Sequence, residues 1–159
     1  MPSLNVSFYK LMSLMKKYIP NLFDHFVSDF FFCCWKMKSN HNGGQVDNRV
    51  QPSMFASQWF LTIFCVNCPF DLLSRIWDIY LLEGEKTIYR FGIAILKLKD
   101  KELMKMNFED IMKKMKSIFK EVDLEKLIQT ALSIKITRKI LEVSNFWLIL
   151  VNSLPLFRP

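Results

Sequence analysis

The chain has few of the residues that make turns. It contains only 4 glycines and 6 prolines among 159 residues. An all-β sandwich or barrel needs turn residues at short, regular intervals. No stretch alternates polar and apolar residues over a strand's length between such turns. The scarcity therefore argues against β architecture.

Long apolar runs are missing as well. Segments 30–35 and 146–151 are each unbroken apolar sequence, but they are far shorter than the roughly 20 residues that cross a bilayer. No secretory signal peptide is recognisable, and the four cysteines lie in apolar surroundings. We expect a reduced, cytoplasmic location, either free or peripheral to endomembranes.

What the chain does contain favours helices. Hydrophobic residues make up 51% of the sequence and charged residues 23%, which is enough apolar material for a core. Apolar residues recur at helical spacing, and the sequence predicts an all-α fold. The expected buried positions are Leu11, Leu14, Met15 and Tyr18; Phe55, Trp59, Phe60, Ile63 and Phe64; Leu72, Leu73, Ile76, Trp77, Tyr80 and Leu81; Ile88, Phe91, Ile95 and Leu98; Phe108, Ile111, Met112, Met115, Ile118 and Phe119; and Leu124, Leu127, Ile128, Ala131 and Leu132.

The net charge of +7 comes largely from one region. Residues 97–139 contain 12 Lys and Arg against 7 Asp and Glu, interleaved with apolar residues at helical spacing. This pattern is typical of a solvated helix face, and no nucleic-acid motif accompanies it. We therefore predict no nucleic-acid partner. Binding of residues 97–120 to an acidic membrane surface stays open as an alternative.

Candidate catalytic and metal-binding residues are sparse. Cys65 and Cys68 have the spacing of a zinc or redox pair, but zinc needs two further ligands. The remaining candidates lack a suitable spacing, and there is no phosphate-binding glycine loop. We predict no catalytic residue, cofactor or metal, with both cysteines buried at the end of an apolar helix. The other residues considered are Cys33, Cys34, His25 and His41.

Two further groups have an ordinary structural interpretation. Arg75 and Asp78 lie three residues apart, so they are expected to form an ion pair on one helix. Met104, Met112 and Met115 lie along one helical stripe. We expect them to fill the core, although methionines also form adaptable partner surfaces.

Three segments resemble conserved parts of the TBC domain family. Residues 52–64, PSMFASQWFLTIF, resemble its Ser-Gln-Trp helix, and residues 75–84, RIWDIYLLEG, resemble its Arg-Ile-Trp-Asp signature. Residues 14–26, LMKKYIPNLFDHF, resemble the preceding helix. Order and spacing agree, so the resemblance implies a partial TBC domain over residues 4–142.

The resemblance also implies a function. TBC domains stimulate GTP hydrolysis by Rab GTPases, regulating vesicle traffic, by inserting an arginine and a glutamine into the nucleotide site. These belong to Ile-x-x-Asp-x-x-Arg and Tyr-x-Gln motifs, neither of which occurs in this sequence. Gln58 belongs to the Ser-Gln-Trp element and is expected to be structural. The chain is thus expected to be the C-terminal half, inactive without the missing N-terminal half; a non-catalytic module that binds a GTPase or another partner is the alternative.

Two segments depart from the family pattern. An inserted loop is expected at 27–50, and residues 143–159 form a tail without amphipathic rhythm. Both departures contain Val-Ser at their start, which the splice-donor sequence GTAAGT encodes in frame. We hypothesise either intron-derived sequence or a lineage-specific loop and tail.

Overall fold

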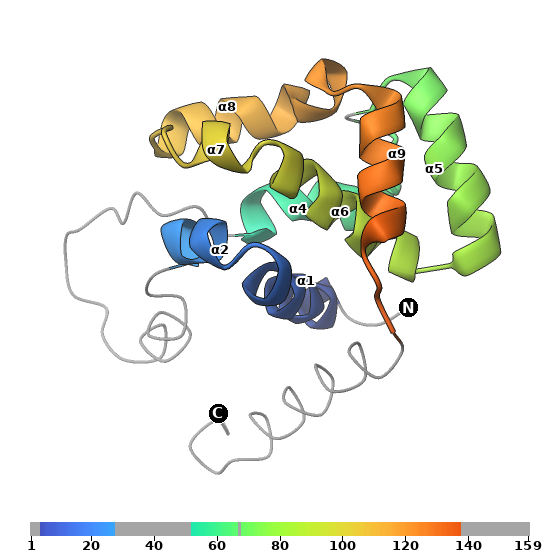
Figure 1. Ribbon diagram of the computed structural model, residues 1–159, viewed down its shortest axis with the longest axis horizontal. Helices are drawn as coiled ribbons and strands as arrows, with labels where there is room; N and C mark the ends of the chain where they lie inside the picture. The colour runs from blue at the N-terminus through green and yellow to red at the C-terminus, as the bar shows by residue number, and fades with distance from the viewer. Residues whose placement is uncertain (1–3, 28–51, 67, 138–159) are drawn as a thin grey trace, which may run out of the picture.

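The computed structural model describes residues 4–27, 52–66 and 68–137, in which every element of secondary structure is helical (Figure 1). The all-α prediction is confirmed. Most of the predicted insertion and the predicted tail lie outside the described residues. None of the described helices has the length and apolar character needed to span a bilayer. The elements are α1 (Leu4–Tyr18), α2 (Pro20–Val27), α4 (Pro52–Thr62), α5 (Phe70–Glu83), α6 (Lys86–Leu98), α7 (Asp100–Leu103), α8 (Phe108–Ser117), the 3₁₀ helix η1 (Ile118–Glu121) and α9 (Leu124–Ser133).

Helix boundaries follow the local chemistry of the chain. The Asn107 side chain caps α8 by accepting a hydrogen bond from the backbone N–H of Asp110 at 3.1 Å. The Asp123 side chain caps α9 in the same way, by accepting from the backbone N–H of Glu125 at 3.1 Å. Gly84 ends α5 with φ of 73°, a conformation that suits glycine, and its N–H donates to the carbonyl of Tyr80 at 2.7 Å. Each of these helix ends therefore has a residue type that favours its position.

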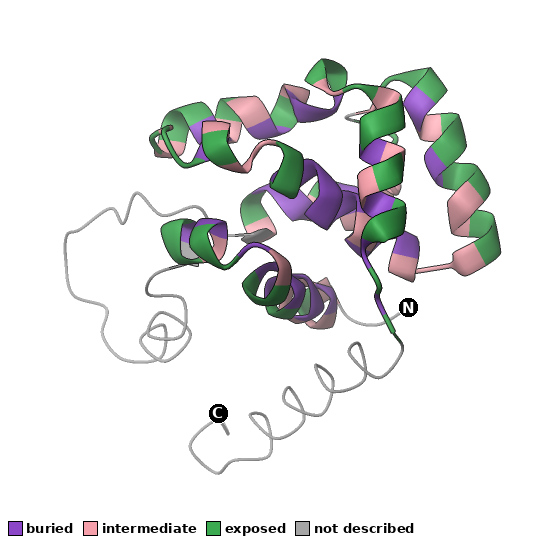
Figure 2. Cartoon of the chain, in the orientation of Figure 1, coloured by how far each residue is buried: buried purple, intermediate pink, exposed green. Residues whose placement is uncertain are grey.

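Helix α6 is the centre of the fold. It packs against α1, α4, α5 and α9, and nearly all of its residues from Thr87 to Leu96 are buried. In Figure 2 most of α6 is purple (buried), whereas the helices around it contain many green (exposed) residues. Three of the four positions predicted to be buried on α6 are buried, namely Ile88, Phe91 and Ile95. Leu98 is the exception, because it lies at the exposed end of the helix.

An aromatic cluster joins α4 to the helices around it. Trp59 is only 1% exposed, and its ring centroid lies 5.0 Å from Phe55 and 5.7 Å from both Phe64 and Phe119. Such edge-on and tilted contacts stabilise a core beyond the area they bury. On α6, Gly92 lies against the indole: a Cβ there would meet its ring at 3.4 Å, which is van der Waals contact.

The chain leaves α4 through an unusual turn. Helix α4 ends at Thr62, and Ile63 and Phe64 follow with φ of 48° and 65°, which is rare for residues with a Cβ. The turn directs Phe64 into the aromatic cluster, where it is fully buried. The prediction that Phe64 is buried is confirmed, but it reaches the core from a left-handed turn, beyond the helical stripe.

A polar contact ties α1 to the turn between α5 and α6. The Lys10 ammonium lies 3.2 Å from Glu85 Oε1, which also accepts a hydrogen bond from the Tyr89 hydroxyl at 2.7 Å. Burial raises the pKa of Tyr89, and the adjacent Glu85 carboxylate raises it further. Because Lys10 is buried, loss of Glu85 would leave a cation without its partner.

Candidate interaction surface

Helix α5 exposes a line of large apolar side chains. Phe70 is 80% exposed, Trp77 39% and Leu81 77%. Their separations of seven and four residues place them on one side of the helix. We call these three residues the α5 stripe. The prediction that Trp77 and Leu81 point inward is wrong, because Leu72 and Ile76 occupy the core-facing side.

The sequence contains a signal for this surface that a search for a single stripe misses. Apolar residues cover more than half of the circumference of α5, and its polar residues are confined to a narrower sector. An apolar stripe of about 100° suffices to face one core, so a wider one indicates contacts on a second side. The apolar residues are Phe70, Leu72, Leu73, Ile76, Trp77, Ile79, Tyr80, Leu81 and Leu82.

Trp77 is held in place although much of it is exposed. Its indole Nε1 donates a hydrogen bond to the carbonyl of Ile63 at 3.2 Å. This bond attaches α5 to the turn that follows α4. The exposed ring therefore has a defined position, and a surface that is already ordered binds a partner at a smaller entropic cost.

A shallow cleft separates α5 from α9, on another side of α5. Its volume is about 340 Å³, and Arg75 and Asp78 line it with Glu125 from α9. Among the described residues, no ion pair joins Arg75 to Asp78, so the predicted pair is wrong. The two charged groups face the cleft instead. The remaining lining residues are Ile79, Leu124 and Ile128.

The cysteines are placed differently from the prediction. Because α4 ends at Thr62, Cys65 lies in the following turn and is exposed, and Cys68 is half-buried. Burial, with a smaller contribution from Cys65, raises the pKa of Cys68 to about 12. Its thiol is protonated at neutral pH and is a poor nucleophile or metal ligand. Within the described ranges, no group of His, Cys, Asp and Glu could hold a metal ion.

The other histidine, glutamine and arginine side chains with catalytic potential are scattered. His25 is exposed on α2, and Gln58 is exposed on α4, where its carbonyl accepts a hydrogen bond from Thr62 at 2.7 Å. Half-buried Arg90 pairs with Glu83, a contact between α6 and the end of α5. The structure brings none of these together into a catalytic arrangement among the residues it describes. Cys33, Cys34, His41, Arg49 and Arg138 lie outside that part of the chain.

The methionines divide between core and surface. Met115 is buried at 2% exposure and Met112 is half-buried, which agrees with core filling. Met104 is 40% exposed and lies after α7, so the core prediction is wrong there. Likewise Leu132, predicted on the buried face of α9, is 53% exposed.

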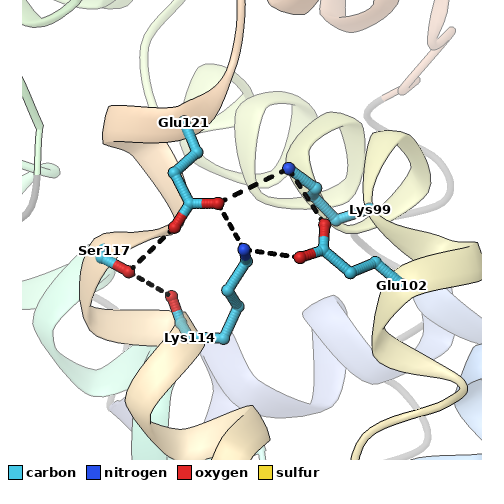
Figure 3. A network of polar contacts seen from close by, with 5 residues as sticks. All are labelled: Lys99, Glu102, Lys114, Ser117 and Glu121. Atoms are coloured by element: carbon cyan, nitrogen blue, oxygen red, sulfur yellow. Dashed lines mark hydrogen bonds and ion pairs between the residues drawn. The ribbon is translucent and has the colours of Figure 1, made fainter.

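Four charged side chains form a network between α7, α8 and η1 (Figure 3). Lys114 contacts Glu102 and Glu121, while Lys99 lies 3.0 Å from Glu102 and 3.7 Å from Glu121. Hydrogen bonds from Lys114 lower the pKa of both carboxyls, and Lys99 contributes at Glu102. The Ser117 hydroxyl lies 3.3 Å from Glu121. Two cations and two anions thus neutralise one another.

Comparison with known proteins agrees with the helical architecture and with the motifs on α4 and α5. The Rab-GTPase-TBC domain matches residues 1–104, and the chain belongs to this family. The sequence is 31% identical over 142 residues to the mouse Ecotropic viral integration site 5 protein, covering 87% of this chain and 15% of that protein. It is 31% identical over 111 residues to the Rab GTPase-activating protein tbc-11 of Caenorhabditis elegans, covering 70% and 10%.

A yeast relative extends the comparison to fungi. The chain is 23% identical over 112 residues to the GTPase-activating protein GYP5 of Saccharomyces cerevisiae, covering 70% of this chain and 10% of that protein. The chain thus spans only a small part of the length of these relatives. The names of the nematode and yeast relatives describe those two proteins as GTPase-activating proteins.

Proposed function

We propose that this chain is the C-terminal half of a Rab GTPase-activating domain and regulates vesicle traffic only when completed. Its proposed partners are a Rab GTPase and the N-terminal half that contains the finger motifs. The observation that supports this most directly is the α5 stripe. Phe70, Trp77 and Leu81 expose large apolar surface on the helix that contains the family's Arg-Ile-Trp-Asp signature.

The stripe is suited to a domain interior. Exposed apolar side chains scattered singly need no explanation, but a row along one helix marks a contact. Helix α5 is apolar on both its core-facing side and this outer side, as expected of a helix covered from two directions. We assign the outer side to the half of the domain that contains the fingers. The α5 stripe would then join the two halves.

The chain by itself should leave Rab GTP hydrolysis unchanged. An arginine finger is worth roughly a thousandfold or more in rate. The described arginines have other surroundings: Arg90 pairs with Glu83, and Arg75 lines the α5–α9 cleft. We therefore describe the chain as a part of a regulator without catalytic residues of its own.

Single-turnover GTP hydrolysis across a Rab panel tests the proposal. The chain is assayed alone and together with the finger-containing half of a relative's TBC domain. We expect no acceleration alone and clear acceleration together. Robust stimulation by the chain alone would refute the proposed division of the domain.

A double substitution tests the stripe directly. Phe70→Ser with Leu81→Ser should abolish complementation, because it removes the apolar contact. Met54→Ser with Leu132→Ser is the matched control, since these side chains are 48% and 53% exposed on α4 and α9. The control should complement normally. Equal loss with both double variants would show that the α5 stripe is not the joining surface.

A non-catalytic binding module is the second candidate, favoured by the α5–α9 cleft. Arg75, Asp78 and Glu125 surround an apolar floor there, which suits binding better than chemistry. In this case a Rab protein should bind the chain, with no acceleration even when the finger-containing half is present. Under this second proposal, Arg75→Ala should weaken Rab binding. Under the first proposal, the same variant should leave complementation through the α5 stripe intact.

A further inference from the structure

The lysines between residues 97 and 120 form two sets, one paired with glutamates and the other without an ion pair among the described residues. Lys99 and Lys114 are neutralised by Glu102 and Glu121 in the network of Figure 3. The other lysines between residues 97 and 120 are exposed, and none of them forms an ion pair with another described residue. These are Lys97, Lys101, Lys105, Lys113, Lys116 and Lys120.

Three of these lysines share one corner with exposed apolar side chains. Leu98 is 39% exposed and Met104 40%, between Lys97, Lys101 and Lys105. We call these five residues the basic corner. A lysine's charge with an apolar neighbour is the combination that the headgroup region of a membrane accepts.

The backbone brings these residues together where α6 meets α7. Lys99 caps the end of α6 through its N–H, which donates to Ile95 at 3.2 Å, and α7 starts at the next residue. Lys97 lies in the last turn of α6, Lys101 in α7 and Lys105 just after it, so the three exposed lysines lie within nine residues around this junction. Leu103 of α7, by contrast, is fully buried.

Helix α8 extends the positive surface. It lies beside α7 (Figure 1), and the Lys114–Glu102 ion pair joins the two. Its core-facing residues are Ile111 and Met115, so Lys113 and Lys116 lie on its outward sides, and Lys120 is exposed on the following η1. Exposed Glu109 and Asp110 oppose them only in the first turn of α8, where carboxylates also favour the helix N-terminus.

We propose that the basic corner, supported by the outward lysines of α8, binds an anionic lipid membrane. Anionic headgroups complement the lysines, and the acyl boundary accepts Leu98 and Met104. A nucleic acid would satisfy the lysines but would leave those two apolar side chains without a role. The proposal concerns a surface separate from the α5 stripe, and it stands whether or not the chain activates a GTPase.

Vesicle sedimentation tests the proposal with the full chain. We expect binding to vesicles of phosphatidylcholine and phosphatidylserine that weakens with added salt, and little binding to phosphatidylcholine alone. The triple variant Lys97→Gln, Lys101→Gln and Lys105→Gln should lose roughly a hundredfold in partition, from about 1 kcal/mol for each lysine. Absence of binding by the unaltered chain would overturn the proposal.

A matched triple variant controls for net charge. Lys16→Gln, Lys126→Gln and Lys135→Gln removes the same charge from exposed lysines on α1, α9 and the segment after it. It should retain most of the binding. An equal loss in both triple variants would show that total charge, and not the basic corner, drives association.

The apolar pair separates lipid from nucleic acid. Leu98→Gln with Met104→Gln should reduce binding to the anionic vesicles by about tenfold. Binding to duplex DNA, measured in parallel, should be weak for every variant. Tight DNA binding, with no effect of the apolar pair on either ligand, would identify a general polyanion surface and overturn the assignment to lipid.

Discussion

The surroundings of two tryptophans show how differently the two sides of the α4–α5 pair are built. Trp59 is 1% exposed within a ring of phenylalanines, and Trp77 is 39% exposed on the outer side of α5. The hydrogen bonding of the two indole N–H groups does not follow their burial. The buried Trp59 Nε1 has no acceptor among the described residues, whereas Trp77 donates to Ile63 at 3.2 Å. One indole fills a closed core, and the other is held in position on an open face.

The contrast separates what folding requires from what assembly requires. Trp59 packs against Phe55 and Phe119 of the same chain, so its burial stabilises the fold of this chain directly. The α5 stripe has the same apolar chemistry without such cover. Substitution at the two tryptophans should therefore affect different properties, and this gives the comparison a direct test.

The largest effect is expected at Trp59. Trp59→Ala should lower the free energy of unfolding by about 3–5 kcal/mol, because it opens a cavity in the aromatic cluster. Trp77→Ala should cost only about 1–2 kcal/mol, from partial burial and one hydrogen bond. Chemical denaturation of both variants measures the difference.

A third variant controls for the unpaired indole N–H. Trp59→Phe keeps most of the packing and removes a buried donor that has no acceptor among the described residues. It should cost less than Trp59→Ala. Equal costs for Trp59→Ala and Trp77→Ala would mean that the outer side of α5 is covered within this chain.

A smaller effect is expected where α6 meets Trp59. Gly92→Val would place branched carbons against a ring already within 3.4 Å of a Cβ position. Overpacking of this kind should cost about 1–3 kcal/mol, measured by thermal or chemical denaturation. The same denaturation series on the outer side provides the contrast: Leu81→Val should be within about 0.5 kcal/mol of the unaltered chain. A neutral Gly92→Val would show that the core around Trp59 is loosely packed.

Helix positions and caps were predictable from the sequence because their causes are local. The Asn107 and Asp123 side chains satisfy backbone groups within three residues, and Gly84 adopts its positive φ within one turn. Apolar spacing also located the buried side of α8. The turn at Ile63 and Phe64 was not predictable, since Phe64 packs against Phe119, which is far away in the sequence.

The interaction surface was less accessible to sequence reasoning. Trp77 and Leu81 have the spacing of core residues, and periodicity cannot say which of two apolar sides of a helix meets a neighbour. Arg75 and Asp78 have ion-pair spacing, but their separation along the chain does not fix where the side chains point. Such choices depend on α9 and on the turn after α4, which are set by the tertiary fold.

The smallest effect concerns the turn where the two environments meet. Phe64 points into the aromatic cluster, Cys65 is exposed, and Cys68 is half-buried before α5. The pKa of Cys68 is raised to about 12 from an ordinary value of 9.0, because burial disfavours the thiolate. Folding thus favours the protonated thiol. The stabilisation from this group is complete at neutral pH and is lost as pH rises from about 9 towards 12.

Alkylation measures that difference at individual thiols. At pH 8 the Cys68 thiol should react with iodoacetamide roughly a thousandfold more slowly than a thiol of ordinary pKa, since only the thiolate is nucleophilic. Its rate should continue to rise with pH while the fold persists, and Cys65 should be labelled first. In denaturant the two should react alike, which provides the control. Equal labelling in the folded chain, resolved by peptide mass spectrometry, would mean that the turn exposes both cysteines and that the closed environment ends at Phe64.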